Sequence, residues 1–226
     1  MPISKPEAVC RVSVSMGVQY SLGGVVSADY IDVRASHQMG VALLWRGAEG
    51  PALELARAEV RDDTLIAQGA WVRAEPEPYS LSYALETASG FVTRALTVSA
   101  WGAGWSRSLG LRRRDDGAWV AEPGGELTHV AGALDCDLGY CCLTNTMPVL
   151  RYGLLEGGGP IDLLMAWVSV PGLQVEASTQ RYTHIVGRPG GGAVVRYESG
   201  NFAADIEFDG DGFVTDYPRL GRRIRQ

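Results

Sequence analysis

Two aspartates placed two residues apart are the feature of this sequence closest to chemistry. Asp135 and Asp137 alternate with apolar residues, so in an extended strand both side chains would leave the same face, about 7 Å apart. Paired carboxylates can divide the general-acid and general-base roles, as they do in glycoside cleavage. They also occur in purely structural ion pairs, so both roles have to be considered.

The residues that follow the aspartates fit a structural role equally well. Residues 144–148 read Thr-Asn-Thr-Met-Pro, and a Met-Pro step resists continuation of a helix or of a central strand. Arg151 comes three residues later. In the structural interpretation, Asp135, Asp137 and Arg151 satisfy one another and the backbone of this irregular turn. In the catalytic alternative, a carbohydrate-active hydrolase, Glu86 or Asp216 would be a third ionisable group.

No other catalytic or metal-binding pattern stands out. The sequence has no Gly-x-Ser-x-Gly nucleophile elbow, and Cys136 falls on the apolar side of its strand, where thiols are normally inert. The four cysteines form no Cys-x-x-Cys pair, and the three histidines are far apart in sequence. We therefore expect free thiols, no metal and no cofactor. The cysteines are Cys10, Cys136, Cys141 and Cys142.

Composition limits the class of protein. The chain has 226 residues, of which 46% are hydrophobic and 20% charged, enough for one all-β domain with a substantial core. A net charge of −6 argues against nucleic acid and anionic membranes as partners. No apolar run approaches the roughly 20 residues that cross a bilayer. Polar residues interrupt the stretch before Asp29 that could be a signal peptide, so a cytoplasmic location is expected.

Short segments of period-two alternation, separated by turn residues, recur from Met39 onward. This pattern predicts a single-domain, curved antiparallel sheet, and no segment shows a sustained helical period. Residues 1–38 have no clear partner strand, so we expect an N-terminal extension that is not part of a 39–226 domain. The arginine-rich end from Arg219 to Arg225 is expected to be a solvated tail. The expected strands lie near 41–46, 53–60, 65–72, 80–85, 91–100, 105–111, 134–140, 163–168, 173–185, 193–198, 202–208 and 213–217.

From about Leu43 to Arg223 the chain resembles the bacterial glycolipid-binding family, formerly a domain of unknown function. The most specific stretches are Asp-Cys-Asp-Leu-Gly at 135–139, Leu-Thr-Asn-Thr-Met-Pro at 143–148 and Asp-Tyr-Pro at 216–218. Shorter matches are Leu-Leu-Trp-Arg at 43–46, Tyr-x-Leu-Glu at 83–86, Val-Thr-Arg at 92–94, Trp-Ser-Arg at 105–107, Met-Ala-Trp at 165–167 and Gln-Arg-Tyr at 180–182.

This resemblance implies a spiral β-roll, or half-open barrel, similar to that of bacterial lipoprotein carriers. It implies no catalytic residues, so the protein is expected not to be an enzyme but to hold a lipid or glycolipid on the concave face of the roll. A structural or interaction domain remains the alternative, and the oligomeric state stays open. Candidate walls of the ligand site are Tyr83, Trp105, Trp167 and Tyr182. Candidates for its polar end are Arg57, Arg94, Asp135, Asp137, Asn145 and Arg151.

Overall fold

A computed structural model describes residues 40–224 of the chain. The predictions made for residues 1–38 lie outside this range.

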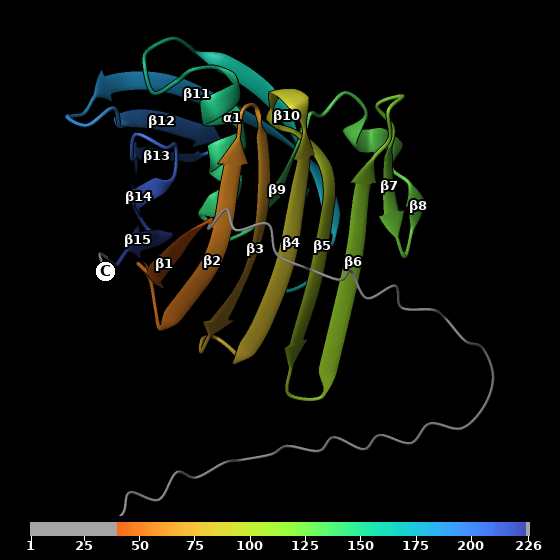
Figure 1. The fold of residues 1–226 in the computed structure, drawn as a ribbon. Helices are drawn as coiled ribbons and strands as arrows, with labels where there is room; N and C mark the ends of the chain where they lie inside the picture. The colour runs from red at the N-terminus through yellow and green to blue at the C-terminus, as the bar shows by residue number, and fades with distance from the viewer. Residues whose placement is uncertain (1–39, 225–226) are drawn as a thin grey trace, which may run out of the picture. The chain divides into compact units, whose positions relative to one another are not determined.

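The described residues form one open, curved sheet, as the alternation predicted, rather than a closed barrel (Figure 1). The strands follow one another across the sheet in the order β8-β7-β6-β5-β4-β3-β2-β1-β15-β14-β13-β12-β11-β10-β9, and every neighbouring pair is antiparallel except β9 with β10. The first half comprises β1 (Val41–Gly47), β2 (Ala52–Arg61), β3 (Thr64–Arg73), β4 (Tyr79–Ala88), β5 (Val92–Gly102), β6 (Trp105–Arg113), β7 (Trp119–Glu122) and β8 (Gly125–Glu126). The second half comprises β9 (Asp135–Leu138), β10 (Ile161–Val168), β11 (Val175–Gly187), β12 (Ala193–Ser199), β13 (Phe202–Phe208), β14 (Val214–Tyr217) and β15 (Gly221–Arg223).

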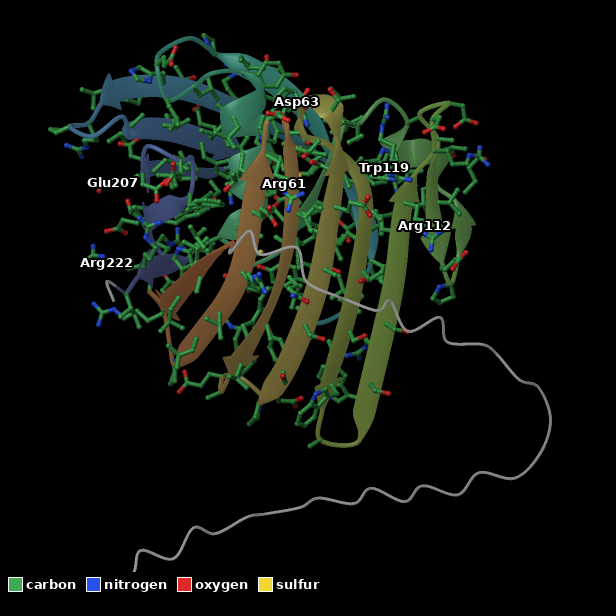
Figure 2. The ribbon with its side chains drawn as sticks, viewed as in Figure 1. Arg61, Asp63, Arg112, Trp119, Glu207 and Arg222 are labelled. Carbon is green, nitrogen blue, oxygen red and sulfur yellow. The ribbon has the colours of Figure 1, made fainter. Side chains whose placement is uncertain are left out.

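Arg222 and Arg223 lie in a strand rather than in a solvated tail, so the prediction was wrong for these two residues, and Arg225 lies outside the described residues. Strand β15 joins the two halves of the sheet, because it pairs with β14 on one side and with β1 on the other. Arg222 points outward and forms an ion pair with Asp216 (Figure 2). Arg223 pairs with Asp209 at 2.5 Å. The alternating pattern was hidden in the sequence because one of the three residues of β15 is a glycine and the other two are charged.

One short α-helix, α1 (Thr146–Arg151), follows β9 through the 3-10 turn η3 (Leu143–Asn145). The other 3-10 turns are η1 (Ser89–Phe91) and η2 (Thr128–Val130). The Met-Pro step was expected to resist a helix, yet Pro148 lies inside α1. A proline is tolerated there because the first-turn N–H groups have no partner within the helix.

The sheet curves around α1, and its edge strand β9 lies within the curve, where the Cys136 N–H donates to Thr93 Oγ1 of β5 (Figure 1). We call the side facing α1 the inner face and the opposite side the outer face. The inner face is filled by protein: Leu143, Met147 and Val149 are fully buried between the two halves of the sheet. They pack with inward residues of the long strands, such as Leu81 and Leu96. The tight fit extends to the backbone, since a Cβ on Gly212 would lie 2.5 Å from a methyl carbon of Leu150.

Candidate functional site

The Asp135 carboxylate is buried and forms a two-pronged ion pair with Arg151. The Arg151 Nη1 and Nη2 atoms donate to the two Asp135 oxygens at 2.6 and 2.5 Å. Arg151 also donates to the backbone carbonyls of Gly90 at 2.6 Å and Phe91 at 2.5 Å. Burial raises the pKa of Asp135, while the hydrogen bonds from Arg151 oppose that shift. The paired geometry favours the ionised pair, which ties α1 to the turn before β5.

Asp137, the second aspartate, has neutral partners. Thr144 Oγ1 donates to one of its carboxylate oxygens at 2.8 Å and Gln180 Nε2 to the other at 2.7 Å. Burial raises the pKa of Asp137, and these two hydrogen bonds act against the rise. The Tyr182 hydroxyl extends the network by donating to Asn145 Oδ1 at 3.0 Å.

The five predicted site residues inside the roll lie in two hydrogen-bonded groups. Asp135 and Arg151 form the first, which connects β9 with α1. Asp137, Asn145 and Tyr182 belong to the second, in which Gln180 lies between Asp137 and Tyr182 and which connects β9, η3 and β11. Both carboxylates accept hydrogen bonds from protein groups, as in the structural interpretation, but Asp137 is held by Thr144 and Gln180 rather than by Arg151. The direct chemical effect of both groups is to satisfy polar atoms that burial would otherwise leave unpaired.

The other five predicted residues are dispersed. Tyr83 is buried on the inner face, and its hydroxyl donates to Glu54 at 2.9 Å. Trp105 is half-buried at the β5–β6 hairpin, with the Arg107 guanidinium 4.3 Å from its ring centroid. Trp167 is half-buried on β10, where it is in register with Asp137. The remaining two are surface arginines, Arg57 on β2 and Arg94, which pairs with Glu86 at 3.3 Å.

A buried acid that the sequence analysis missed lies on β2. Glu54 is only 6% exposed and receives hydrogen bonds from the Tyr83 hydroxyl at 2.9 Å, Cys141 Sγ at 3.3 Å and the Cys142 backbone N–H at 3.3 Å. Burial raises its pKa from 4.5 to about 7, although all three hydrogen bonds lower it. Strongly perturbed acids of this kind mark candidate functional sites when they lie near a cleft.

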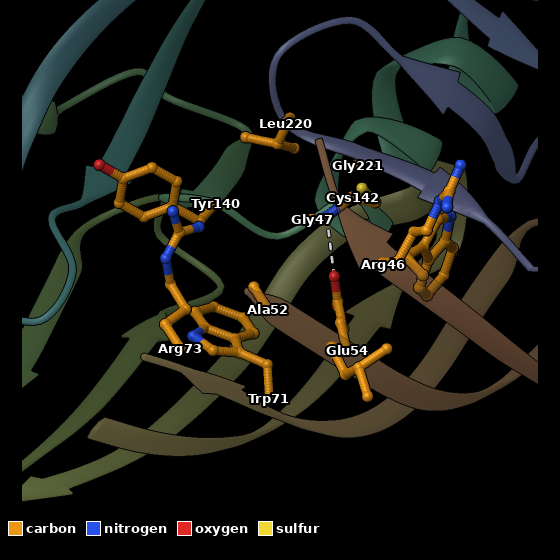
Figure 3. Close-up of a pocket in the computed structure, with 12 residues that line it drawn as sticks. Arg46, Gly47, Ala52, Glu54, Trp71, Arg73, Tyr140, Cys142, Leu220 and Gly221 are labelled. Carbon is orange, nitrogen blue, oxygen red and sulfur yellow. Dashed lines mark hydrogen bonds between the residues drawn. The ribbon is translucent and has the colours of Figure 1, made fainter. Parts of the chain in front are cut away.

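Such a cleft is present above Glu54 (Figure 3). It encloses a hollow of about 20 Å³ whose lining includes Glu54, Trp71, Arg73, Tyr140 and Leu53. In Figure 3 the Glu54 carboxylate points from β2 toward Cys142, with Trp71, Arg73 and Tyr140 to one side of it. The Arg73 guanidinium lies 4.2 Å from the centroid of the Tyr140 ring. We call this the Glu54 cleft.

The alternation of β2 in the sequence does not reveal the Glu54 cleft. Glu54 has the same strand parity as Ala56 and Ala58, and all three side chains are buried on the inner face. Leu53 and Leu55, which alternate with them, are instead 48% and 55% exposed. A reading that places the larger apolar residues inside therefore assigns Glu54 to the wrong face.

Two neighbouring rows on the outer face of β1 to β6 contain a single charged side chain, Arg46. The cross-strand register aligns a row of residues: Leu44, Leu55, Ala70, Ser82, Ser99 and Ser108. Beside it runs a second row: Arg46, Leu53, Val72, Ser80, Trp101 and Ser106. In the β1–β3 part of these rows every residue except Arg46 is aliphatic, and in the β4–β6 part every residue except Trp101 is a serine.

A shallow groove of about 580 Å³ crosses this face. Leu55 is on its lining, small side chains such as Ala70 and Ser82 form its floor, and the predicted ligand residue Arg57 lines it beside Gln68. Val72 is 56% exposed and is the cross-strand partner of Leu53, whereas Ile66, 55% exposed, lies farther along β3 between Glu59 and Glu86. Contiguous exposed aliphatic residues, here Leu53, Leu55 and Val72, indicate interaction sites.

Within residues 40–224, no set of three or more His, Cys, Asp or Glu side chains is arranged to hold a metal ion. Cys136, Cys141 and Cys142 are buried free thiols, as expected. No helix of the described part of the chain has the length and apolar character needed to span a membrane.

The open sheet rolled around a buried helix defines a β-roll protein. Residues 42–223 match the model of the family described as "Putative glycolipid-binding", and the chain belongs to that family. A crystal structure of a DUF1089 family protein from Pseudomonas aeruginosa is similar, with a TM-score of 0.63 and 23% sequence identity over 92% of this chain and 100% of that chain. At this identity the likeness shows the fold alone. No curated protein matches the chain.

Proposed function

We propose that this protein binds a lipid or glycolipid, with the apolar part of the ligand on the outer face of β1–β3. The inner, concave face was the expected place, but its own side chains and α1 fill it, so an acyl chain has no space there. The observation that carries the proposal is the exposed aliphatic surface of Leu53, Leu55 and Val72 beside a groove. The groove volume falls within the roughly 300–1,000 Å³ typical of small-molecule sites.

The family description supports the same class of ligand. An uncharged or sugar-bearing head group suits the net charge of −6, which disfavours anionic surfaces. Arg57 and Gln68 are cross-strand neighbours and offer hydrogen-bond donors at the edge of the aliphatic surface. We expect an affinity in the micromolar range, about −8 kcal/mol.

A protein-interaction domain is the second candidate, because a partner could cover the same exposed aliphatic surface. The hydrolase alternative has less support, since partners within the protein already hold Asp135 and Asp137. That this protein has no catalytic activity is part of the proposal.

Titration with a fluorescent lipid, followed by competition with unlabelled lipids, tests the proposal. Leu55→Gln should weaken binding about tenfold or more, because burial of a leucine side chain contributes roughly 1.5–3 kcal/mol. Ile185→Gln is a matched control, since Ile185 is 50% exposed on the distant strand β11. No saturable and competable signal across several lipid classes, or equal effects of the two substitutions, would refute the proposed site.

A further inference from the structure

We propose that the Glu54 cleft is a head-group site for one uncharged sugar, which lies against the Tyr140 ring and inserts a hydroxyl group beside Glu54. This inference rests on the proposed function and deepens it by naming the chemistry of the head group.

Polar groups at the base of the Glu54 cleft can form further hydrogen bonds. Its hollow of about 20 Å³ has room for a single small polar group, such as a hydroxyl. The Trp71 Nε1 atom and the Tyr79 hydroxyl are both buried and lie near each other, and neither forms a well-aligned hydrogen bond within the described chain. A buried polar atom without a partner costs free energy, and a ligand hydroxyl could supply what is missing. Of these groups, Glu54 and Trp71 line the cleft directly.

The Tyr140 ring lines the cleft, and the backbone of this residue is strained. Tyr140 has a φ of +64°, in a turn closed by a hydrogen bond from the Cys141 N–H to the Leu138 carbonyl at 3.0 Å. The left-handed conformation is unfavourable for a bulky residue, and glycine would avoid that cost. The turn nevertheless presents a tyrosine that is 50% exposed. Strain of this kind is typical of sites where the side chain has a function.

Groups of both charges surround the mouth of the cleft. Arg46 and Arg73 line the cleft itself. Arg73 also lines a neighbouring hollow of about 440 Å³ together with Glu75 and Glu49, and Glu49 pairs with Arg219 at 3.1 Å. A sugar hydroxyl can donate to a carboxylate and accept from an arginine, so an uncharged sugar is compatible with both kinds of charge.

The cleft lies at the start of β2, at one end of the strand. Leu53 lines the cleft and belongs to the outer-face row that contains Val72, whereas the Glu54 side chain faces inward. A ligand with its head group beside Glu54 could therefore reach the outer face of β2 and β3 only if its alkyl chain passed around this end of the strand.

The test compares octyl glycosides (glucoside, galactoside and mannoside) with an octyl phosphocholine, each below its micelle concentration, by calorimetric titration. The sugar-free amphiphile should bind about tenfold more weakly than the best glycoside, the loss expected from one stacking contact and one hydrogen bond. Tyr140→Gly and Trp71→Phe should each remove this preference and leave phosphocholine binding unchanged. Tyr152→Ala is the matched control, because Tyr152 is also exposed and lies beside an arginine, with Arg151 5.8 Å from its ring centroid.

The possible outcomes separate the two proposals. Equal affinity for both head groups, or a preference that survives Tyr140→Gly and Trp71→Phe, overturns the sugar site while lipid binding stands. Saturable chemical-shift changes with the methyl glycosides, lost in Tyr140→Gly, support the sugar site even if no amphiphile binds. Absence of binding by amphiphiles and methyl glycosides alike overturns both proposals. Tyr140→Gly relieves backbone strain, so loss of binding in this variant cannot be attributed to unfolding if its melting temperature is retained.

Discussion

Replacing Glu54 with glutamine should make the protein more stable at alkaline pH. The carboxyl group of Glu54 has a pKa of about 7 in the folded protein and an ordinary value of 4.5, because burial disfavours its charged form. A difference of this size corresponds to about 3 kcal/mol of unfolding free energy. Glutamine has nearly the same shape, can accept the hydrogen bond from the Cys142 N–H and can donate to the Tyr83 hydroxyl. It cannot acquire the buried charge.

The direction of this pH dependence follows from the protons bound in the folded and unfolded states. Between the two pKa values the folded state holds a proton on Glu54 that the unfolded state has released, so stability falls as pH rises through this window. The contribution is fully present below about pH 4.5 and lost above about pH 7. The unfolding free energy of Glu54→Gln should therefore exceed that of the natural protein by up to about 3 kcal/mol near pH 8, and by much less near pH 5.

Denaturant unfolding at a series of pH values measures this difference. Near pH 8 the melting temperature of the variant should be higher by about 5–10 °C, as expected for a domain of this size. Buried Asp135 and Asp137 also titrate abnormally, but they are present in both proteins and cancel in the comparison. Glu176→Gln, at an exposed position on β11, controls for the loss of one negative charge. Parallel stability curves for Glu54→Gln and the natural protein would refute the assignment of a buried, protonated Glu54.

Three further predictions concern stability. Asp135→Ala should lower the free energy of unfolding, measured with denaturant, by about 3 kcal/mol or more, because it leaves the buried Arg151 guanidinium without its partner. Asp137→Ala should lower it by about 1–3 kcal/mol, because the partners of Asp137 are neutral. Equal losses in the two variants would contradict this reasoning. Tyr140→Gly should raise the unfolding free energy by up to about 1 kcal/mol, and a clear decrease would show that the φ of +64° is not a source of strain. A chain that begins at Met39 should melt within about 2 °C of the full chain, and a larger decrease would show that the first residues pack on the domain.

The sequence by itself determined the class of fold and much of the local structure. Period-two alternation and turn residues predicted the long antiparallel strands, because a half-buried strand has to alternate its side chains between two environments. Asp135, Asp137, Asn145 and Arg151 could be grouped because they are close together along the chain. Tyr182 was predicted as well, but its hydrogen bond to Asn145 forms only because β11 lies beside β10 in the folded sheet.

The tertiary structure alone decided which face of each strand is buried. Alternation fixes two sets of side chains but does not say which set points inward, and on β2 the larger apolar side chains point outward. Glu54 reaches Cys141, 87 positions along the chain, because the turn after β9 is held against β2 inside the roll. Ala56 and Ala58 face inward on the same strand, since small side chains leave room for what the sheet encloses. The volume available for side chains on the inner face depends on every element that surrounds it. This volume therefore decided that Glu54 points inward and that Leu53 and Leu55 point outward.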